Sequence, residues 1–122
     1  EERVRHAGYL GRSDVILLLR GAAACLYPSL YEGFGLPVLE AMAAGVPVLT
    51  SNVSAMPEVI GACGVLTDPE DVDALEAGME TLLLRPDACA RMAAQARQRA
   101  RAFSWEASAT SLAEVYRVVH NR

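Results

Sequence analysis

The stretch that decides the fold lies at residues 28–43 and is PSLYEGFGLPVLEAMA. The apolar run before it, residues 24–28, is typical of a strand covered on both faces, and Pro37 suits the first position of a helix. Between strand and helix lies a loop with two glycines, Gly33 and Gly35, which let a backbone approach a ligand closely. Because ligands of open α/β sheets bind beyond the carboxyl ends of the strands, this order predicts a binding site in the loop.

The helix that begins near Pro37 gives a second reason to expect a ligand in this loop. The N-terminus of a helix has free N–H donors and a partial positive charge, which together favour a phosphate group. A pair of glycines before a helix also occurs in ordinary turns. The glycines alone therefore do not distinguish a phosphate site from a turn.

Two glutamates of the stretch sharpen the hypothesis. Glu40 is the only charged residue from Gly33 to Pro57. Either it is buried in an apolar helix and needs a partner, or it is an exposed glutamate in the first turn of the helix, stabilised by the helix dipole. Its Cα–Cβ bond tilts toward the helix N-terminus, so its carboxylate is expected to lean toward the loop, where it could bind a ribose diol. Glu32 precedes the first loop glycine and could contact a second part of the same ligand, or be an ordinary loop glutamate.

Strands and helices alternate along the chain, which indicates βαβ units and an α/β fold. The short apolar runs at 24–28 and 46–50 suit strands of a parallel sheet. We therefore predict a Rossmann-like open parallel sheet with flanking helices and right-handed crossovers. The expected strands are 3–10, 24–28, 46–50 and 64–67. The expected helices are 14–22, 37–44, 55–60, 70–84, 87–102 and 105–120.

The last three helices carry recognisable signals in the sequence. Asp68 is expected to cap the first of them, with Pro69 at its first position, and Ser104 is expected to cap the last. One apolar face of the last helix carries Leu112, Val115, Tyr116 and Val119. A basic cluster on the helix before it, interpreted as a solvated face or as a contact with anionic lipid or a partner, consists of Arg91, Arg97, Arg99 and Arg101.

The composition excludes several classes of protein. With 122 residues, of which 52% are hydrophobic, the chain suits one folded domain or part of one rather than a disordered segment. Its 15 acidic residues outnumber its 11 basic ones and give a net charge of −4, opposite to the balance of a general nucleic-acid binder. Every basic residue is Arg, so chemistry that needs a lysine, such as a Schiff base or a Walker-A contact, is excluded within this chain.

The cysteines and the first residues bear on the cellular compartment. Cys25, Cys63 and Cys89 are widely and unequally spaced. An odd number without a Cys-x-x-Cys pair argues against a disulfide framework or a metal site, so free thiols in a reducing cytoplasm are expected. Residues 1–5 are charged and lack the apolar core of a signal peptide. The weakly charged stretch at 34–52 is interrupted by glycines and prolines, which does not fit a membrane-spanning helix.

The two glutamates together point to a family. Glu32 and Glu40 have seven residues between them, and residues 32–48 strongly resemble the Glu-x7-Glu signature of group 1 (family 4) glycosyltransferases of the GT-B fold. The resemblance extends across essentially the whole chain. Its further matches are residues 5–10, 28–29, 50–54, 57–59, 64–69 and 103–105.

The resemblance implies a role for each matching residue. Glu32 would contact hydroxyls of the donor sugar near the reacting face, as the catalytic residue. Glu40 would bind the ribose hydroxyls of the nucleotide. Gly8 and Tyr9 are candidates for lining the base. The backbone expected to bind the sugar and the diphosphate is that of Gly33, Phe34, Gly35 and Leu36.

The implied reaction moves a sugar, with retention at the anomeric carbon, from a UDP-, GDP- or ADP-linked donor to a glycan, lipid or other acceptor. Bacterial polysaccharide biosynthesis is the expected setting. The resemblance implies no metal or other cofactor, because the helix end and basic side chains stabilise the leaving diphosphate. The expected location is the cytoplasm, at the inner face of the membrane if the acceptor is lipid-linked, with no nucleic-acid partner.

The resemblance also implies that residues 1–122 are part of a donor-binding domain. The acceptor-binding N-terminal domain, and the start of the donor domain with the Arg and Lys that grip the diphosphate in relatives, are expected outside this chain. The chain alone is therefore expected to transfer no sugar at a significant rate. Apolar surface that would pack on the absent strands is expected to be exposed, and self-association could cover it.

Two other functions stay open on the sequence. A non-catalytic nucleotide-binding or interaction domain could keep the loop and lose transfer, although the presence of both Glu32 and Glu40 favours the enzyme. A related GT-B enzyme, such as a sugar-nucleotide epimerase or a phosphorylase, is the third hypothesis. A phosphorylase would need a cofactor lysine, which this chain does not contain.

Overall fold

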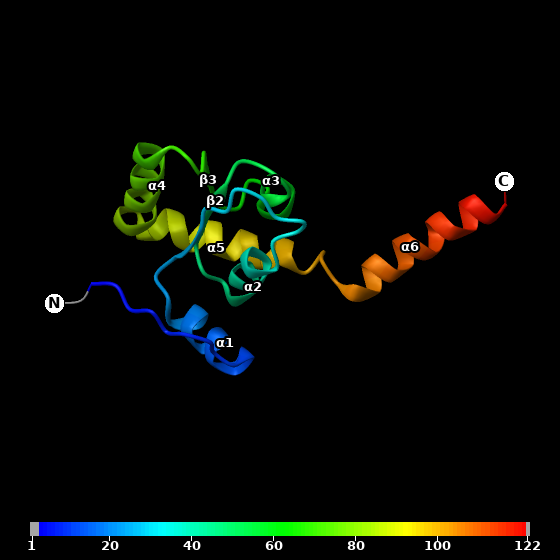
Figure 1. Ribbon diagram of the computed structural model, residues 1–122, viewed down its shortest axis with the longest axis horizontal. Helices are drawn as coiled ribbons and strands as arrows, with labels where there is room; N and C mark the ends of the chain where they lie inside the picture. Colours follow the sequence, from blue (N-terminus) through cyan, green and yellow to red (C-terminus); the bar gives the residue numbers. More distant parts are fainter. Residues whose placement is uncertain (1–2, 122) are drawn as a thin grey trace.

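The computed structural model describes residues 3–121. Within them a three-stranded sheet is packed with five helices, and the C-terminal helix extends away from this body (Figure 1). The strands are β1 (Cys25–Tyr27), β2 (Val48–Ser51) and β3 (Val65–Thr67). The helices are α1 (Arg12–Gly21), α2 (Leu36–Ala44), α3 (Met56–Ile60), α4 (Val72–Leu84), α5 (Pro86–Ala100) and α6 (Trp105–His120).

The three strands are parallel and stand in the order β1-β2-β3, so each crossover leads to the neighbouring strand. The register places Leu49 of β2 between Leu26 of β1 and Val65 of β3. All of β2 is buried, as a central strand covered on both faces requires. The predicted Rossmann-like parallel sheet with flanking helices is therefore confirmed.

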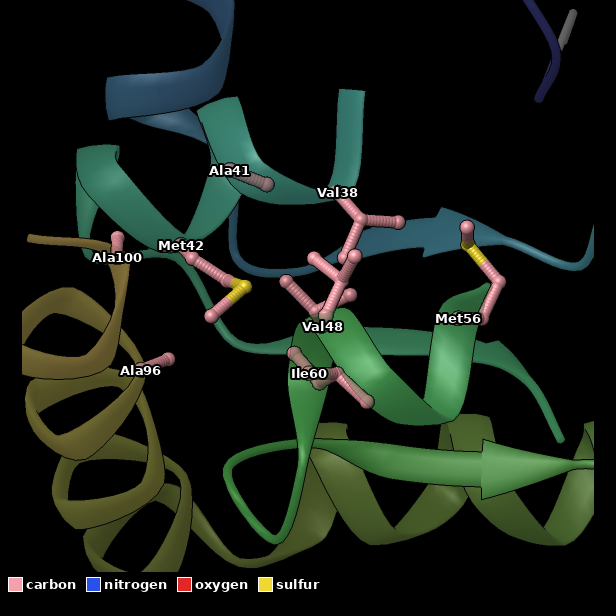
Figure 2. Packing of buried hydrophobic residues seen from close by; sticks show 9 residues of the cluster. Val38, Ala41, Met42, Val48, Met56, Ile60, Ala96 and Ala100 are labelled. Atoms are coloured by element: carbon pink, nitrogen blue, oxygen red, sulfur yellow. The ribbon is translucent and has the colours of Figure 1, made fainter. Parts of the chain in front are cut away.

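One face of the sheet is covered by α2, α3 and the C-terminal half of α5 (Figure 2). Val48 of β2 points to this side and gathers with Met42 of α2 and Ile60 of α3, all of them fully buried. Burying such side chains stabilises a fold by roughly 1.5–3 kcal/mol each. The buried members of this cluster are Val38, Ala41, Met42, Val48, Met56, Val59, Ile60, Ala96 and Ala100.

The opposite face of the sheet is covered by α4 and the N-terminal half of α5. Leu49 of β2 points there and clusters with Leu82 of α4 and Cys89 of α5. Farther along, α5 reaches the first cluster and lies beside Gly45 and Pro47, which lead into β2. α5 therefore joins the two layers at the end of the sheet opposite to the carboxyl ends of the strands.

Arg99 caps the end of α3 instead of lying on a solvated basic face, so that prediction is wrong for this residue. Its Nε donates to the carbonyl of Val59 at 2.8 Å, and its Nη2 donates to the carbonyl of Glu58 at 2.7 Å. The last carbonyls of a helix have no intrahelical partner, so they accept from a nearby cation. The sequence of α5 does not reveal that α3 ends beside it. The exposed members of the predicted cluster are Arg91, Arg97 and Arg101.

α4 begins two residues later than predicted, at Val72. Its cap is Asp71, whose side chain accepts the N–H of Ala74 at 2.9 Å. Asp68 instead accepts the N–H of Glu70 at 3.0 Å, within the preceding turn. Either aspartate could cap a helix, but Asp68 binds within the turn after β3, which leaves Asp71 as the cap of α4. The prediction that Ser104 caps α6 is confirmed.

Residues 3–10 do not form the predicted strand. No strand of the described chain pairs with them, and both Val4 and Tyr9 are exposed, Tyr9 fully. A strand needs a hydrogen-bonded neighbour, and the three-stranded sheet begins at β1.

Two of the helices expose several large apolar side chains. That exposed apolar surface would pack on strands outside this chain stays a prediction. α6 extends away from the body with its apolar side uncovered (Figure 1), and α1 exposes Leu17 and Leu18. Among residues 3–121 no helix is both long enough and apolar enough to cross a bilayer. The exposed apolar side chains of α6 include Leu112, Val115, Tyr116 and Val119.

Gly78 offers a test of the packing of α4 on the sheet. A Cβ at Gly78 would lie 2.5 Å from Cδ1 of Leu49 and 3.2 Å from Cγ2 of Thr67. The expected result for Gly78→Ala is a loss of about 1–3 kcal/mol in unfolding free energy, because overpacking outweighs the gain in helix propensity. Urea denaturation measures it, and the exposed Glu76→Ala on the same helix should stay within about 0.5 kcal/mol of the parent. Unchanged or increased stability of Gly78→Ala would contradict this packing.

Candidate functional site

Two loops that follow neighbouring strands form the site. Residues 28–35 follow β1 and residues 52–55 follow β2, and since the two strands are parallel neighbours, both loops leave the sheet at the same edge. The hydroxyl of Ser54 donates to the carbonyl of Glu32 at 2.6 Å and accepts from the N–H of Glu32 at 3.0 Å. Ser54 has a φ of 59°, in the left-handed region that non-glycine residues rarely adopt. The main chain of Glu32 is therefore held by the neighbouring loop.

The side chain of Glu32 is held as well. The phenol of Tyr27, the last residue of β1, donates to Oε1 of Glu32 at 2.5 Å. The hydroxyl of Ser29 lies 3.1 Å from the same oxygen and 3.2 Å from the carbonyl of Tyr31, so its one proton is shared between these two acceptors. Tyr27 is itself anchored by the pairing of β1 with β2 and by Thr50, whose hydroxyl donates to the Tyr27 carbonyl at 2.8 Å. Two donors on one oxygen give the half-buried carboxylate a defined orientation in the loop.

The hydrogen bond also changes the acidity of Tyr27. The pKa of its phenol is raised above the ordinary value, first by the hydrogen bond to Glu32, then by burial and by the charges of Glu32 and Cys25. A tyrosine phenol is already protonated at neutral pH at its ordinary pKa, and the upward shift leaves it so. Tyr27 is therefore the donor of this bond, and the carboxylate of Glu32 is the acceptor.

Gly35 joins the loop to α2 at a position that only glycine fits. Its φ is 94°, and a Cβ built there would overlap the methyl group of Met56 and lie 3.0 Å from its sulfur. Gly33, in contrast, is exposed, with nothing within 4 Å of a built Cβ.

Gly35 is the N-cap of α2. At the start of α2, Pro37 has no N–H group, and the N–H of Val38 donates to the carbonyl of Gly35 at 3.0 Å. An anion at this helix end would therefore be attracted by the partial positive charge of the helix dipole and by the N–H of Leu36.

Glu40 lies on the exposed side of α2, so the predicted exposure is confirmed. The predicted place in the first turn is wrong, because α2 begins at Leu36 and has no acidic residue in its first turn. The buried side of the helix is formed by Val38, Ala41 and Met42, and positions 100° apart place Glu40 outside that side. The idea of a buried carboxylate in need of a partner is therefore wrong. α2 contacts the core along one side only, although nearly all of its residues are apolar.

Phe34 and Leu36 line an open hollow of about 320 Å³ beside the loop. The ring of Phe34 packs edge-on against Phe103, with the ring centres 5.8 Å apart. Trp105, at the start of α6, lines the same hollow. The predicted donor-binding loop therefore has an apolar side that faces the beginning of the last helix.

Gly8 and Tyr9 are not brought to this loop. Tyr9 is fully exposed, and no heavy atom lies within 4 Å of a Cβ built at Gly8. Gly8 has a φ of 66°, which turns the chain in the extended segment before α1. Nothing in the described structure packs these two residues against Glu32 or the N-terminus of α2.

Three residues that hold Glu32, namely Tyr27, Ser29 and Ser54, had no role predicted from the sequence. Tyr27 belongs to an apolar run that predicts only a buried strand, and Ser29 and Ser54 belong to loops that matched the family without an assigned role. All three are polar groups at or just beyond the carboxyl ends of neighbouring parallel strands. That position is the signal that could have identified them.

Comparison with known proteins adds a family context to this geometry. The family model described as Glycosyl transferases group 1 matches residues 1–99. The chain is 45% identical over 120 residues to the O-antigen chain mannosyltransferase B of Escherichia coli. It is 43% identical over 115 residues to the glycogen synthase of Mycobacterium tuberculosis. These alignments cover 95% and 92% of this chain, but 30% and 28% of the two relatives.

A solved structure has the same arrangement of elements. The sucrose-phosphate synthase from Thermosynechococcus elongatus matches 98% of this chain with a TM-score of 0.86 and 32% sequence identity. The match covers 31% of that protein. This chain therefore spans less than a third of the length of each of these three proteins.

The two loop glycines form a matched pair for testing how the site is built. We expect Gly35→Ala to lower the unfolding free energy by about 2–4 kcal/mol, because it combines a strained φ with a clash against Met56. Gly33→Ala, at an exposed position without close neighbours, should cost less than about 1 kcal/mol. Thermal and urea unfolding measure both, and equal stabilities would show that the loop does not approach α3 as described.

Proposed function

This chain belongs to the group 1 glycosyl transferases, and we propose that it is the donor-binding portion of a retaining enzyme. The enzyme moves a sugar from a nucleotide-sugar to a glycan, lipid or other acceptor. The observation that carries the proposal is the carboxylate of Glu32, oriented in a loop that leads directly into the N-terminus of α2. A carboxylate suits sugar hydroxyls, and a helix N-terminus suits a diphosphate.

Each site residue has a proposed role. Glu32 accepts hydrogen bonds from hydroxyls of the donor sugar at the reacting face. The backbone of residues 33–36 binds the sugar and the diphosphate, and the helix end stabilises the leaving diphosphate without a metal. Glu40 binds the ribose, a role that its exposure on α2 supports because a ligand can reach it. The proposal that Gly8 and Tyr9 line the base has no support in the described contacts.

We propose that the remaining parts of the catalytic machinery lie in a longer protein. The relatives named above are more than three times as long as the matched region. An acceptor-binding domain and the basic groups that grip the diphosphate would belong to that remainder, since this chain has no lysine. The free cysteines suit the cytoplasm as the compartment of such an enzyme.

Nucleotide binding by the full-length protein tests the donor site. UDP, GDP and ADP are titrated by calorimetry, and one of them is expected to bind. Glu40→Ala should weaken that binding about tenfold or more, because two hydrogen bonds to the ribose are lost. Glu76→Ala, which removes an exposed helical glutamate from α4, is the control and should bind as the parent does. If no nucleotide binds and Glu40→Ala changes nothing, the donor site is not where we propose it.

Residues 1–122 alone should not transfer sugar at a significant rate. The reason is that the acceptor and the basic grip on the diphosphate are proposed to come from outside this chain. The isolated chain is incubated with UDP-glucose, ADP-glucose and GDP-mannose, and release of the nucleoside diphosphate is followed beside the full-length protein. Robust turnover by the isolated chain would contradict its role as the donor-binding portion.

A further inference from the structure

Four hydrogen bonds converge on Glu32 from three separate parts of the fold. Ser54, in the loop after β2, holds its main chain through two of them. Tyr27, at the end of β1, and Ser29, in the residue's own loop, both donate to Oε1. Such convergence on one half-buried carboxylate indicates that its orientation, and not only its presence, is specified.

The two donors act on the same carboxylate oxygen. A carboxylate oxygen has two lone pairs. Those of Oε1 face Tyr27 and Ser29, whose hydroxyl proton is shared with the carbonyl of Tyr31. Among residues 3–121 the structure shows no hydrogen bond to Oε2 of Glu32. The carboxyl group is therefore held by one oxygen, and the other is available to a ligand in the loop.

Tyr27 is well suited to this role because it does not belong to the loop that it orients. Its main chain is paired in the sheet opposite Thr50, and the Thr50 hydroxyl donates to its carbonyl. A donor fixed in the sheet transmits the rigidity of the strands to a side chain in a glycine-containing loop. A hydrogen bond that served only to close the loop could be made between two residues of the loop, whereas Glu32 is bound by a residue of β1.

We propose that Tyr27 and Ser29 are positioning residues that bind Oε1 of Glu32 and so present Oε2 to a hydroxyl group of the donor sugar. The inference rests on the proposed function and deepens it, since it assigns a separate role to each oxygen of the carboxylate. Loss of either donor lets the carboxyl group rotate, which weakens its contact with the reacting sugar. The proposed site places the nucleotide part of the donor at Glu40 and at the start of α2, so its affinity is expected to be unaffected.

The experiment compares variants of the full-length protein by steady-state kinetics with whichever of UDP-glucose, ADP-glucose and GDP-mannose is turned over. Tyr27→Phe removes only the phenol oxygen and should lower kcat/KM about tenfold to a hundredfold, mainly through kcat. The affinity for the matching nucleoside diphosphate, measured by calorimetry, should stay within about twofold of the parent. Tyr31→Phe is the matched control, because it removes an exposed phenol from the same loop, and its kinetics should equal those of the parent.

Variants of Ser29 provide a second, independent test of the proposal. Ser29→Ala should lower kcat/KM, and Ser29→Thr, which keeps a hydroxyl, should restore most of it. This pair keeps the proposal testable if Tyr27→Phe does not fold. Thermal unfolding of every variant reports any general loss of structure.

Three outcomes would each contradict the positioning role, the proposed function or both, and the measurements distinguish them. If Glu32→Ala abolishes transfer while Tyr27→Phe and Ser29→Ala behave like the parent, the positioning role is wrong and the proposed function stands. If activity, nucleoside diphosphate affinity and thermal stability fall together in Tyr27→Phe and Ser29→Ala, the bonds are merely structural and the positioning role is again wrong. If Glu32→Ala transfers sugar like the parent, the proposed function fails, and this inference fails with it.

Discussion

The parallel pairing of β1 with β2 is the constraint on which the candidate site depends. Tyr27 is in register with Thr50, so the chain leaves both strands at the same edge and the two following loops meet. Ser54 can then hold the main chain of Glu32 while Tyr27 holds its carboxylate. A register slip of one residue would turn Tyr27 to the other face of the sheet and remove its phenol from Glu32. The sheet therefore positions the residues of the candidate site, although none of its strands exceeds four residues.

Apolar packing fixes the N-terminus of α2 at the end of the loop that carries Glu32. Val38 and Met42 hold α2 in the buried cluster against β2, and Met56 of α3 occupies the space that a side chain at Gly35 would need (Figure 2). The glycine is thus part of the core as well as of the loop. A helix end fixed in this way presents partial positive charge to a ligand without any lysine, which agrees with the composition of the chain.

Local patterns predicted most of the fold but few of the contacts at the site. The order of strand, glycine loop and helix is visible because apolar runs and glycines mark it directly in the sequence, and the parallel sheet follows from that order. The segment at 3–10 has no neighbouring strand in the described structure, and the exposure of Glu40 depends on which side of α2 meets the core. Arg99 and Tyr27 find partners that only the assembled fold brings close, the end of α3 and the carboxylate of Glu32.

The placement of a nucleotide-sugar on this edge of the sheet is the central claim, and a crystal structure of the full-length protein with the donor bound tests it most directly. The expected result is a sugar hydroxyl within hydrogen-bond distance of Glu32 and a diphosphate at the N-terminus of α2. Donor density elsewhere would contradict the claim. An example is the hollow of about 550 Å³ that Arg97 and Arg101 line beside α5, at the opposite end of the sheet.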